Sequence, residues 1–178
     1  MPKAGSTRTP RSAAAGPAFH ELVSYRLQKA AYYATRPAYL AYAREFGITG
    51  VEWRLLGNLY AAAPLTLARV AEEADVQPAQ ASRVLAALVQ RGLVSSETDA
   101  RDARAVRLAL TAEGRALYRR LLARTARLHD TLVAELDAAQ REQLYRMLDL
   151  IADAGRRLLV QARAAARADA AKAKVRRG

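Results

Sequence analysis

Cysteine is absent from the 178-residue sequence, which excludes disulfides, thiolate metal sites and cysteine-based redox sensing. No apolar run approaches the roughly 20 residues that a membrane-spanning helix needs, and residues 1–17 lack the apolar segment of a secretory signal. We therefore predict a cytoplasmic protein without a membrane partner. Because a Gly-rich phosphate loop and a metal-binding spacing of histidines are also missing, we predict neither a cofactor nor an enzyme activity.

The net charge of +12 is concentrated at the two ends of the chain. Residues 1–16 carry a net charge of +3 and residues 161–178 carry +5, which leaves +4 on residues 17–160. Residues 65–111 hold six basic and six acidic side chains and are therefore neutral overall. Basic tails attract phosphate regardless of base sequence, but they also keep an Ala-rich end in solution. The charge alone leaves both interpretations open.

Apolar spacing predicts a mainly helical fold with a small β-hairpin, in the order α-α-α-α-β-β-α-α. The expected elements are helices from Phe19 up to Gly47, over 51–60, 66–74 and 78–90, a hairpin over 93–110, a helix from 111 to about 136, and a last helix from Asp137. Pro37 is expected to kink the first helix or to divide it. Thr111 is expected to cap the helix that follows the hairpin.

Residues 67–88 have the apolar spacing of a helix-turn-helix. Small Ala71 permits two helices to cross closely, and Val76 fills the turn. If the second helix buries Ala81, Val84, Leu85 and Leu88, its opposite face is small apart from one arginine and two short polar groups. Such a face fits the major groove, where Arg reads guanine and Gln reads adenine. We expect DNA contacts from Gln77, Pro78, Ala79, Gln80, Ser82 and Arg83; an ordinary solvated face is the alternative.

The hairpin carries Asp99-Ala-Arg101-Asp102-Ala-Arg104 at its tip. A charged turn is usually only solvated, but directly after a recognition helix it is typical of a wing. An arginine on such a wing enters the minor groove, where the negative potential of DNA is focused. We expect Arg101 and Arg104 to contact DNA and Asp102 to orient an arginine.

The ordered combination of several motifs resembles the MarR family of bacterial regulators over about residues 20–160. The motifs are the helix-turn-helix, Gly92-Leu-Val94, Asp102-Ala-Arg104 and Leu110-Thr-Ala-Glu-Gly114. Residues 24–27, 52–54 and 80–83 are similar to a branch associated with aromatic-acid catabolism. The resemblance implies a dimer on a palindromic operator in double-stranded DNA, with recognition helices in major grooves and wings in minor grooves. Ser96 stands where many relatives have Arg, which removes one phosphate contact.

We expect the helices outside the DNA-binding region to form a dimer, because their apolar stripes are too long for one small motif to cover. A single-chain bundle is the alternative. The expected domains are a disordered basic arm over 1–16, dimerisation helices over 17–50, a winged helix-turn-helix over 51–111, further dimerisation helices over 112–161 and a basic Ala-rich tail over 162–178.

Nine of the eleven aromatic residues fall between residues 19 and 60. Most are interpreted as core or dimer contacts, but buried Trp and Tyr need polar partners. A crevice with aromatic walls and one or two cations suits a small planar carboxylate. The expected effector residues are His20, Ser24, Tyr25, Arg26 and Trp53. The branch resemblance implies a nicotinate-like or hydroxycinnamate-like acid.

The sequence therefore predicts a homodimeric, sequence-specific repressor that a small aromatic acid releases from its operator. One alternative is a sequence-tolerant architectural protein that binds DNA through the +8 of its two tails. Another is a repressor of the same type that has no small-molecule ligand.

Overall fold

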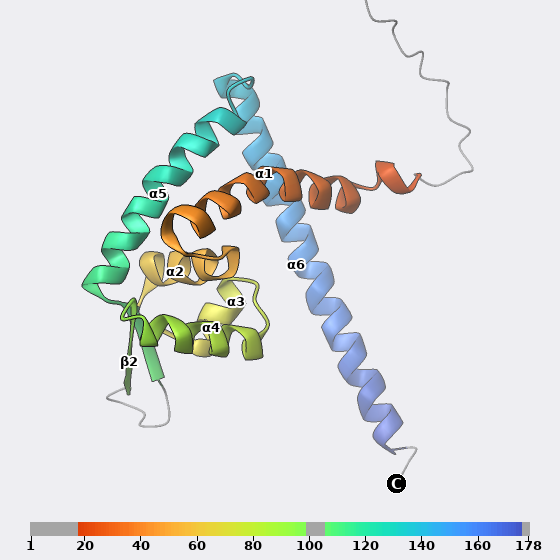
Figure 1. Ribbon diagram of the computed structural model, residues 1–178. Helices are drawn as coiled ribbons and strands as arrows, with labels where there is room; N and C mark the ends of the chain where they lie inside the picture. Colours follow the sequence, from red (N-terminus) through yellow and green to blue (C-terminus); the bar gives the residue numbers. More distant parts are fainter. Residues whose placement is uncertain (1–17, 99–105, 176–178) are drawn as a thin grey trace, which may run out of the picture. The chain divides into compact units, whose positions relative to one another are not determined.

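The structure, a computed structural model, describes residues 18–98 and 106–175 (Figure 1). The helices are η1 (Phe19–Glu21, a 3-10 turn), α1 (Val23–Phe46), α2 (Gly50–Ala62), α3 (Leu67–Glu73), α4 (Pro78–Gln90), α5 (Ala112–Leu132) and α6 (Ala138–Val175), and the strands are β1 (Leu65–Thr66), β2 (Val94–Thr98) and β3 (Val106–Leu110). The predicted fold class is confirmed. The basic arm over 1–16 and the hairpin tip over 99–105 lie outside the described residues.

The chain divides into two compact units, one up to Leu128 and the other from His129 onward. In the described ranges, no helix combines the length and the apolar composition that a membrane span requires.

The first long helix is continuous through Pro37, so this proline does not divide it into two helices. Since proline lacks an N–H, the Tyr33 carbonyl loses its helical donor without ending the helix. The predicted start at Phe19 corresponds to η1, and Leu22 is extended before α1 begins. The helix ends at Gly47, whose left-handed φ of 62° favours glycine.

The N-terminus of α2 is held by a capping box. The Thr49 N–H donates to Glu52 Oε2 at 2.7 Å, and the Glu52 N–H donates to Thr49 Oγ1 at 3.2 Å. Arg91, at the C-terminal end of α4, donates to Glu52 Oε1 at 2.6 Å and to the Gly47 carbonyl at 3.3 Å. Glu52 is only 8% exposed. This nearly buried carboxylate therefore joins the end of α4 to the junction of α1 and α2.

The core of the first unit lies around α2, with α3 and α4 on one side of it (Figure 1). The largest fully buried side chains are Tyr42, Ile48, Leu55, Leu56, Leu59, Val70, Leu85, Leu88 and Leu121. They come from α1, α2, α3, α4 and α5 and from the α1–α2 turn, so one core holds all these helices together.

The sheet has three antiparallel strands in the order β1-β3-β2. The predicted hairpin is present, with Val94 opposite Leu110 and Thr98 opposite Val106. The strand β1 was not predicted, because two residues are too few to show an alternating pattern. Thr66, predicted as helical, instead ends β1 and caps α3 by accepting from the Arg69 N–H at 3.4 Å.

The start of α5 is pressed against the start of the hairpin. Thr111 Oγ1 donates to the Gly92 carbonyl at 2.7 Å and accepts from the Gly114 N–H at 3.0 Å, which confirms the predicted cap. A Cβ built on Gly114 would lie 2.0 Å from the Leu93 carbonyl oxygen. Only glycine fits at this contact.

In the second unit, Asp137 caps α6 by accepting from the Gln140 N–H at 2.8 Å, and the Gln140 side chain accepts from the Asp137 N–H at 2.9 Å. The helix therefore starts where the sequence predicted. It continues to Val175, beyond the expected end of the helical region at 161, because Ala, Arg and Lys favour the helix even without an apolar stripe. The preceding helix α5 ends at Leu132 rather than near 136.

Replacing Gly114 by Ala is expected to lower the free energy of unfolding by about 3 kcal/mol, because the backbone must move away from Leu93. Urea denaturation at fixed protein concentration measures the change. Gly155→Ala is the matched control, since nothing lies within 4 Å of the added Cβ, and the better helix propensity of Ala should stabilise the protein by about 1 kcal/mol. Equal effects of both substitutions would contradict the close contact.

Replacing Glu52 by Ala is expected to cost about 2 kcal/mol of stability, because it removes a cap and leaves Arg91 without its carboxylate partner. Glu72→Ala is the control: Glu72 pairs with Arg69 at 2.9 Å, but both side chains are more than half exposed, so the destabilisation should stay below about 0.5 kcal/mol. Thermal or urea unfolding of the two variants compares them, and similar effects would show that the Glu52 network contributes no more than a surface pair.

Candidate DNA-binding site

The helix α4 buries one face and exposes the other. Ala81, Leu85 and Leu88 are at most 2% exposed, whereas Ser82 and Arg83 lie in solvent. Pro78 occupies the first turn, where its missing N–H leaves no helical bond unmade. The predicted apolar stripe is confirmed, with Val84 half-buried at its edge.

The turn between α3 and α4 is fixed by three contacts. Asp75 takes a left-handed φ of 50°, and buried Val76 donates its N–H to the Ala71 carbonyl at 2.9 Å. Arg54 of α2 donates to the Asp75 carbonyl at 3.4 Å. The direction of α4 relative to α2 and α3 is therefore set by the backbone of the turn as well as by the core.

The six residues of α4 and its N-cap that we expect to contact DNA are all exposed; these are Gln77, Pro78, Ala79, Gln80, Ser82 and Arg83. Among the described residues, the Arg83 side chain has no hydrogen-bond or ion-pair partner. A guanidinium with all its donors available on a face of small side chains has the chemistry to bind a guanine edge or a phosphate.

The wing strands β2 and β3 follow α4 directly and pair over their whole length. They lead to residues 99–105, and the three predicted wing residues Arg101, Asp102 and Arg104 fall in this stretch, outside the described residues. Ser96 is exposed on β2.

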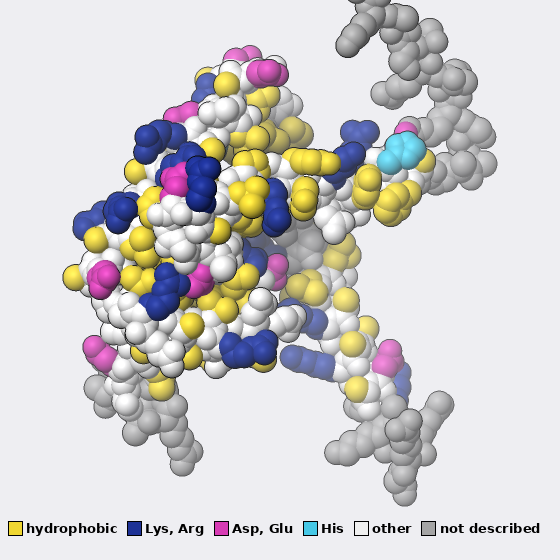
Figure 2. Space-filling model, viewed as in Figure 1, with side chains coloured by type: hydrophobic (Ala, Val, Ile, Leu, Met, Phe, Trp, Pro, Cys, Tyr) yellow, Lys and Arg dark blue, Asp and Glu magenta, His cyan; other side chains and the backbone are white. Residues whose placement is uncertain are grey.

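Several arginines of this unit are paired with carboxylates. On the face shown in Figure 2, Lys and Arg side chains are scattered among acidic and hydrophobic ones. On α3, Arg69 is paired with Glu72 at 2.9 Å and with Glu73 at 2.6 Å, which neutralises it locally. Arg69 is thereby less available to an anionic partner than Arg83.

Trp53 lies in an aromatic cluster that the sequence did not predict. Its ring stacks on Tyr118 of α5 with centroids 4.9 Å apart and approaches Tyr42 of α1 at 5.1 Å, while Tyr60 contacts Tyr118 at 4.8 Å. Burial raises the pKa of Tyr42 and of Tyr118, so both rings stay neutral in the physiological range. The contact of Tyr118 with Trp53 was not predicted, because no spacing in the sequence shows that α5 packs against α2.

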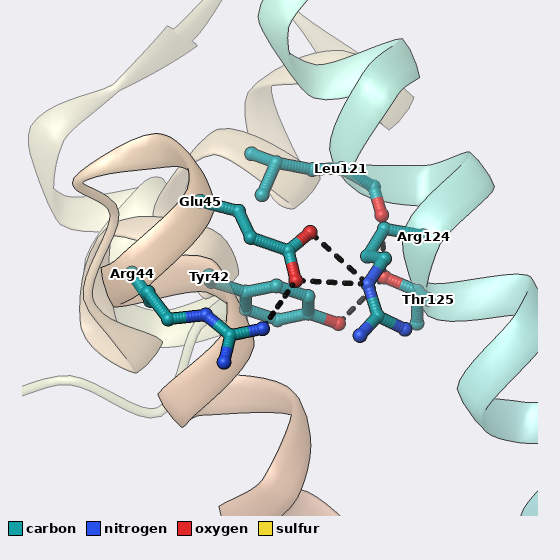
Figure 3. Close-up of polar contacts among 6 residues, drawn as sticks. All are labelled: Tyr42, Arg44, Glu45, Leu121, Arg124 and Thr125. Carbon is teal, nitrogen blue, oxygen red and sulfur yellow. Dashed lines mark hydrogen bonds and ion pairs between the residues drawn. The ribbon is translucent and has the colours of Figure 1, made fainter.

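Polar contacts join α1 to α5 beside this cluster (Figure 3). The hydroxyls of Tyr42 and Thr125 lie 2.5 Å apart, and Thr125 Oγ1 also donates to the Leu121 carbonyl at 2.8 Å. Arg124 Nε donates to Glu45 at 3.1 Å. The Arg124 guanidinium, followed by the Arg44 guanidinium, holds the pKa of the Glu45 carboxyl below its usual range.

Three of the five expected effector residues lie together on η1 and α1. His20, Tyr25 and Arg26 line an open hollow of about 450 Å³ with Lys29, Ala30 and Tyr33. The Arg26 Nε donates to the His20 carbonyl at 3.3 Å. Ser24 is exposed and Trp53 belongs to the aromatic cluster, so neither lines this hollow.

Lys29 and Tyr33 were missed as lining residues of the hollow, although their spacing from Tyr25 and Arg26 places them on the same side of a helix. Over the described residues, no group of three or more acidic or histidine side chains is placed to hold a metal ion.

A scan of family models matches residues 46–105 to the MarR family. The match begins at the end of α1, covers α2, β1, α3, α4 and β2, and ends just before β3. A comparison with curated proteins finds no match.

Solved structures of MarR-type regulators share the fold. The transcriptional regulator PcaV from Streptomyces coelicolor, in complex with its natural ligand, is 28% identical with a TM-score of 0.61, over 75% of this chain and 91% of that one. The transcriptional repressor CouR, bound to a 23-mer DNA duplex, is also 28% identical with a TM-score of 0.68, over 74% of this chain and 93% of that one. A MarR/EmrR family regulator from Acinetobacter sp. ADP1, at 22% identity and a TM-score of 0.67 over 73% of this chain and 92% of that one, shows the same fold.

These neighbours are transcriptional regulators, and the family match falls on the segment that carries the predicted recognition helix. The resemblance to the MarR family predicted from the sequence is thereby confirmed: residues 46–105 match the family model, and the chain shares the fold of MarR-type regulators.

Proposed function

We propose that the protein is a homodimeric repressor that binds a palindromic operator and is released from it by a small aromatic carboxylic acid. The observation that carries the proposal is the exposed face of α4, where Arg83 stands among small side chains within the matched family segment and has no partner in the described part of the chain. The similarity to CouR, whose structure contains a DNA duplex, supports this choice of partner. Two recognition helices about 34 Å apart reach successive major grooves of one duplex.

A second copy of the chain is supported by the apolar side chains that α1 and α6 leave exposed. They are Val23, Tyr32, Tyr33 and Leu40 on α1, and Tyr145, Met147, Leu148, Leu150, Ile151, Leu158, Leu159 and Val160 on α6. A monomer rarely exposes so many large apolar side chains on two helices. In a symmetric dimer the same surface of each copy covers the other.

The hollow on α1 supplies the chemistry for an aromatic acid. Arg26 and Lys29 offer positive charge for a carboxylate, while His20, Tyr25 and Tyr33 offer rings and polar atoms for an aromatic ring and its substituents. PcaV, which shares the fold, has been seen with its natural ligand. An acid that binds most tightly when the recognition helices are wrongly spaced weakens operator binding by the same factor.

Footprinting on the DNA that flanks the protein's own gene, with and without a panel of aromatic acids, tests the proposal as a whole. The expected result is a protected palindrome that one acid releases. Unprotected DNA at every concentration would refute the repressor, and a footprint that no acid changes would leave a repressor without this type of ligand.

Arg83→Ala is expected to weaken operator binding by about 10- to 100-fold, because it removes a base or phosphate interaction worth about 1–3 kcal/mol. Arg146→Ala removes the same charge from α6 and should leave the affinity within about twofold. Fluorescence anisotropy with the operator and with a scrambled duplex measures both variants. If Arg83→Ala weakens the two duplexes equally, Arg83 contacts phosphate and does not read a base.

Arg26→Ala is expected to abolish the thermal stabilisation that an active acid confers, since a ligand at about 100 times its Kd stabilises the folded state by about 2.7 kcal/mol. Arg36→Ala, which removes a charge from the same helix outside the hollow, should retain the stabilisation. Differential scanning fluorimetry with the acid panel gives the comparison. Stabilisation that persists in the Arg26 variant would move the effector site away from this hollow.

A further inference from the structure

The C-terminal part of α6 is a basic helical segment with few large side chains. Residues 156–175 contain six basic residues and one acidic residue. The helix is continuous through this stretch, so its charged residues stand at fixed positions around one axis. The segment differs from the first part of α6, which carries most of the large apolar residues.

Three of these arginines form a single line, here called the basic stripe: Arg156, Arg163 and Arg167. At about 100° per residue, all three fall within about 20° of one direction. Met147, Ile151 and Leu158 fall on the opposite side of the same helix, whereas exposed Tyr145 and Val160 fall within about 40° of the stripe. A second copy that packs against Met147, Ile151 and Leu158 leaves Arg163 and Arg167 exposed.

The helix itself provides no counter-charge for Arg163 and Arg167. Arg156 is paired with Asp153, but the positions three and four residues from Arg163 and Arg167 hold only Leu, Val, Ala and Arg. Both side chains are exposed, and within the described ranges neither has an ion-pair partner. Like charges spaced by four residues destabilise a helix. Their repulsion is relieved when an anionic partner lies along the stripe.

The composition of the segment favours a nucleic acid as that partner. A helix that binds a membrane surface needs a face of Leu, Phe or Trp, and a protein interface is anchored by buried aromatic residues. Residues 161–175 contain no Leu, Ile, Phe, Tyr or Trp. A row of DNA phosphates requires only positive charge within reach.

We propose that the basic stripe binds the phosphate backbone of DNA as a second contact surface, separate from the recognition helix and without base reading. The inference rests on the proposed function, since it assumes that DNA is the partner. The basic stripe adds affinity for any duplex, and α4 and the wing provide the preference for the operator.

The test compares two double variants of the full-length protein that carry the same reduction in charge. R163Q/R167Q removes two arginines of the stripe, and R157Q/K172Q removes two basic residues that point about 100° and 160° away from it. Anisotropy titrations over a range of salt concentrations use a duplex that extends beyond the footprint and a scrambled duplex of equal length.

For R163Q/R167Q we expect affinity to fall by about tenfold on both duplexes. The slope of log K against log salt should become shallower by about 0.9 for each phosphate that the variant no longer neutralises. The ratio of operator to scrambled binding should stay unchanged, and R157Q/K172Q should match the wild type. Equal weakening in both variants would overturn the stripe in favour of a diffuse charge effect, and unchanged affinity in both would overturn the DNA contact.

Two further outcomes separate this inference from the repressor. A wild-type protein that binds both duplexes alike, with R163Q/R167Q weaker on each, supports the stripe and refutes the repressor. Operator-specific binding that R163Q/R167Q leaves unchanged supports the repressor and refutes the stripe. Sedimentation with phosphatidylserine vesicles measures membrane binding of the wild type and both variants. Vesicle binding that is lost in R163Q/R167Q but kept in R157Q/K172Q would overturn the assignment to DNA.

Discussion

The packing of α4 against α2 and α3 is the constraint on which the candidate DNA-binding site depends. Burying Leu85 and Leu88 stabilises the fold by about 2 kcal/mol for each side chain. A rotation of α4 that buried Arg83 would forfeit this burial and would also place an unpaired charge in the core, which costs several kcal/mol more. The same apolar residues that hold the helix thus decide which side chains it presents. The pair of Arg91 and Glu52 then fixes the far end of the helix.

The periodicity of the sequence was enough to predict the helices, the hairpin and the exposed face of α4, because each depends on residues that are neighbours along the chain. The wrong element boundaries and the missed strand arose where the local sequence has no periodic apolar pattern. The strand β1 exists through its pairing of Leu65 with Leu108, far away in sequence, and is too short to show an alternation. The last part of α6 lacks an apolar stripe, so periodicity provided no reason to extend it, although its Ala-rich composition favours helix.

The candidate effector site shows the same difference between contacts of chain neighbours, which the sequence predicts, and contacts of distant residues, which it does not. Tyr25 and Arg26 lie in the first turn of α1 and His20 lies in η1, a few residues earlier, so closeness along the chain was sufficient to bring them together around one hollow. The position of Trp53 depends on Tyr118, which reaches it from α5 across a tertiary contact that one sequence does not reveal. The stack also depends on Gly57, where a Cβ would lie 2.9 Å from the Tyr118 hydroxyl. Trp53 is thereby part of the core that links α2 to α5.

In the proposed repressor, the contacts of α1 connect the helix that carries the hollow to α4. Toward its C-terminal end, α1 is joined to α5 by Tyr42 and Glu45, and the Gly47 carbonyl that follows it accepts from Arg91 at the end of α4. A displacement of α1 must therefore either break these bonds or carry α4 with it. Such a connection produces regulation only when the ligand binds two orientations of α1 with different affinities. By reciprocity, operator DNA then lowers the affinity for the acid by the same factor. A rigid link and a difference in affinity are both required, and the link is present in this chain.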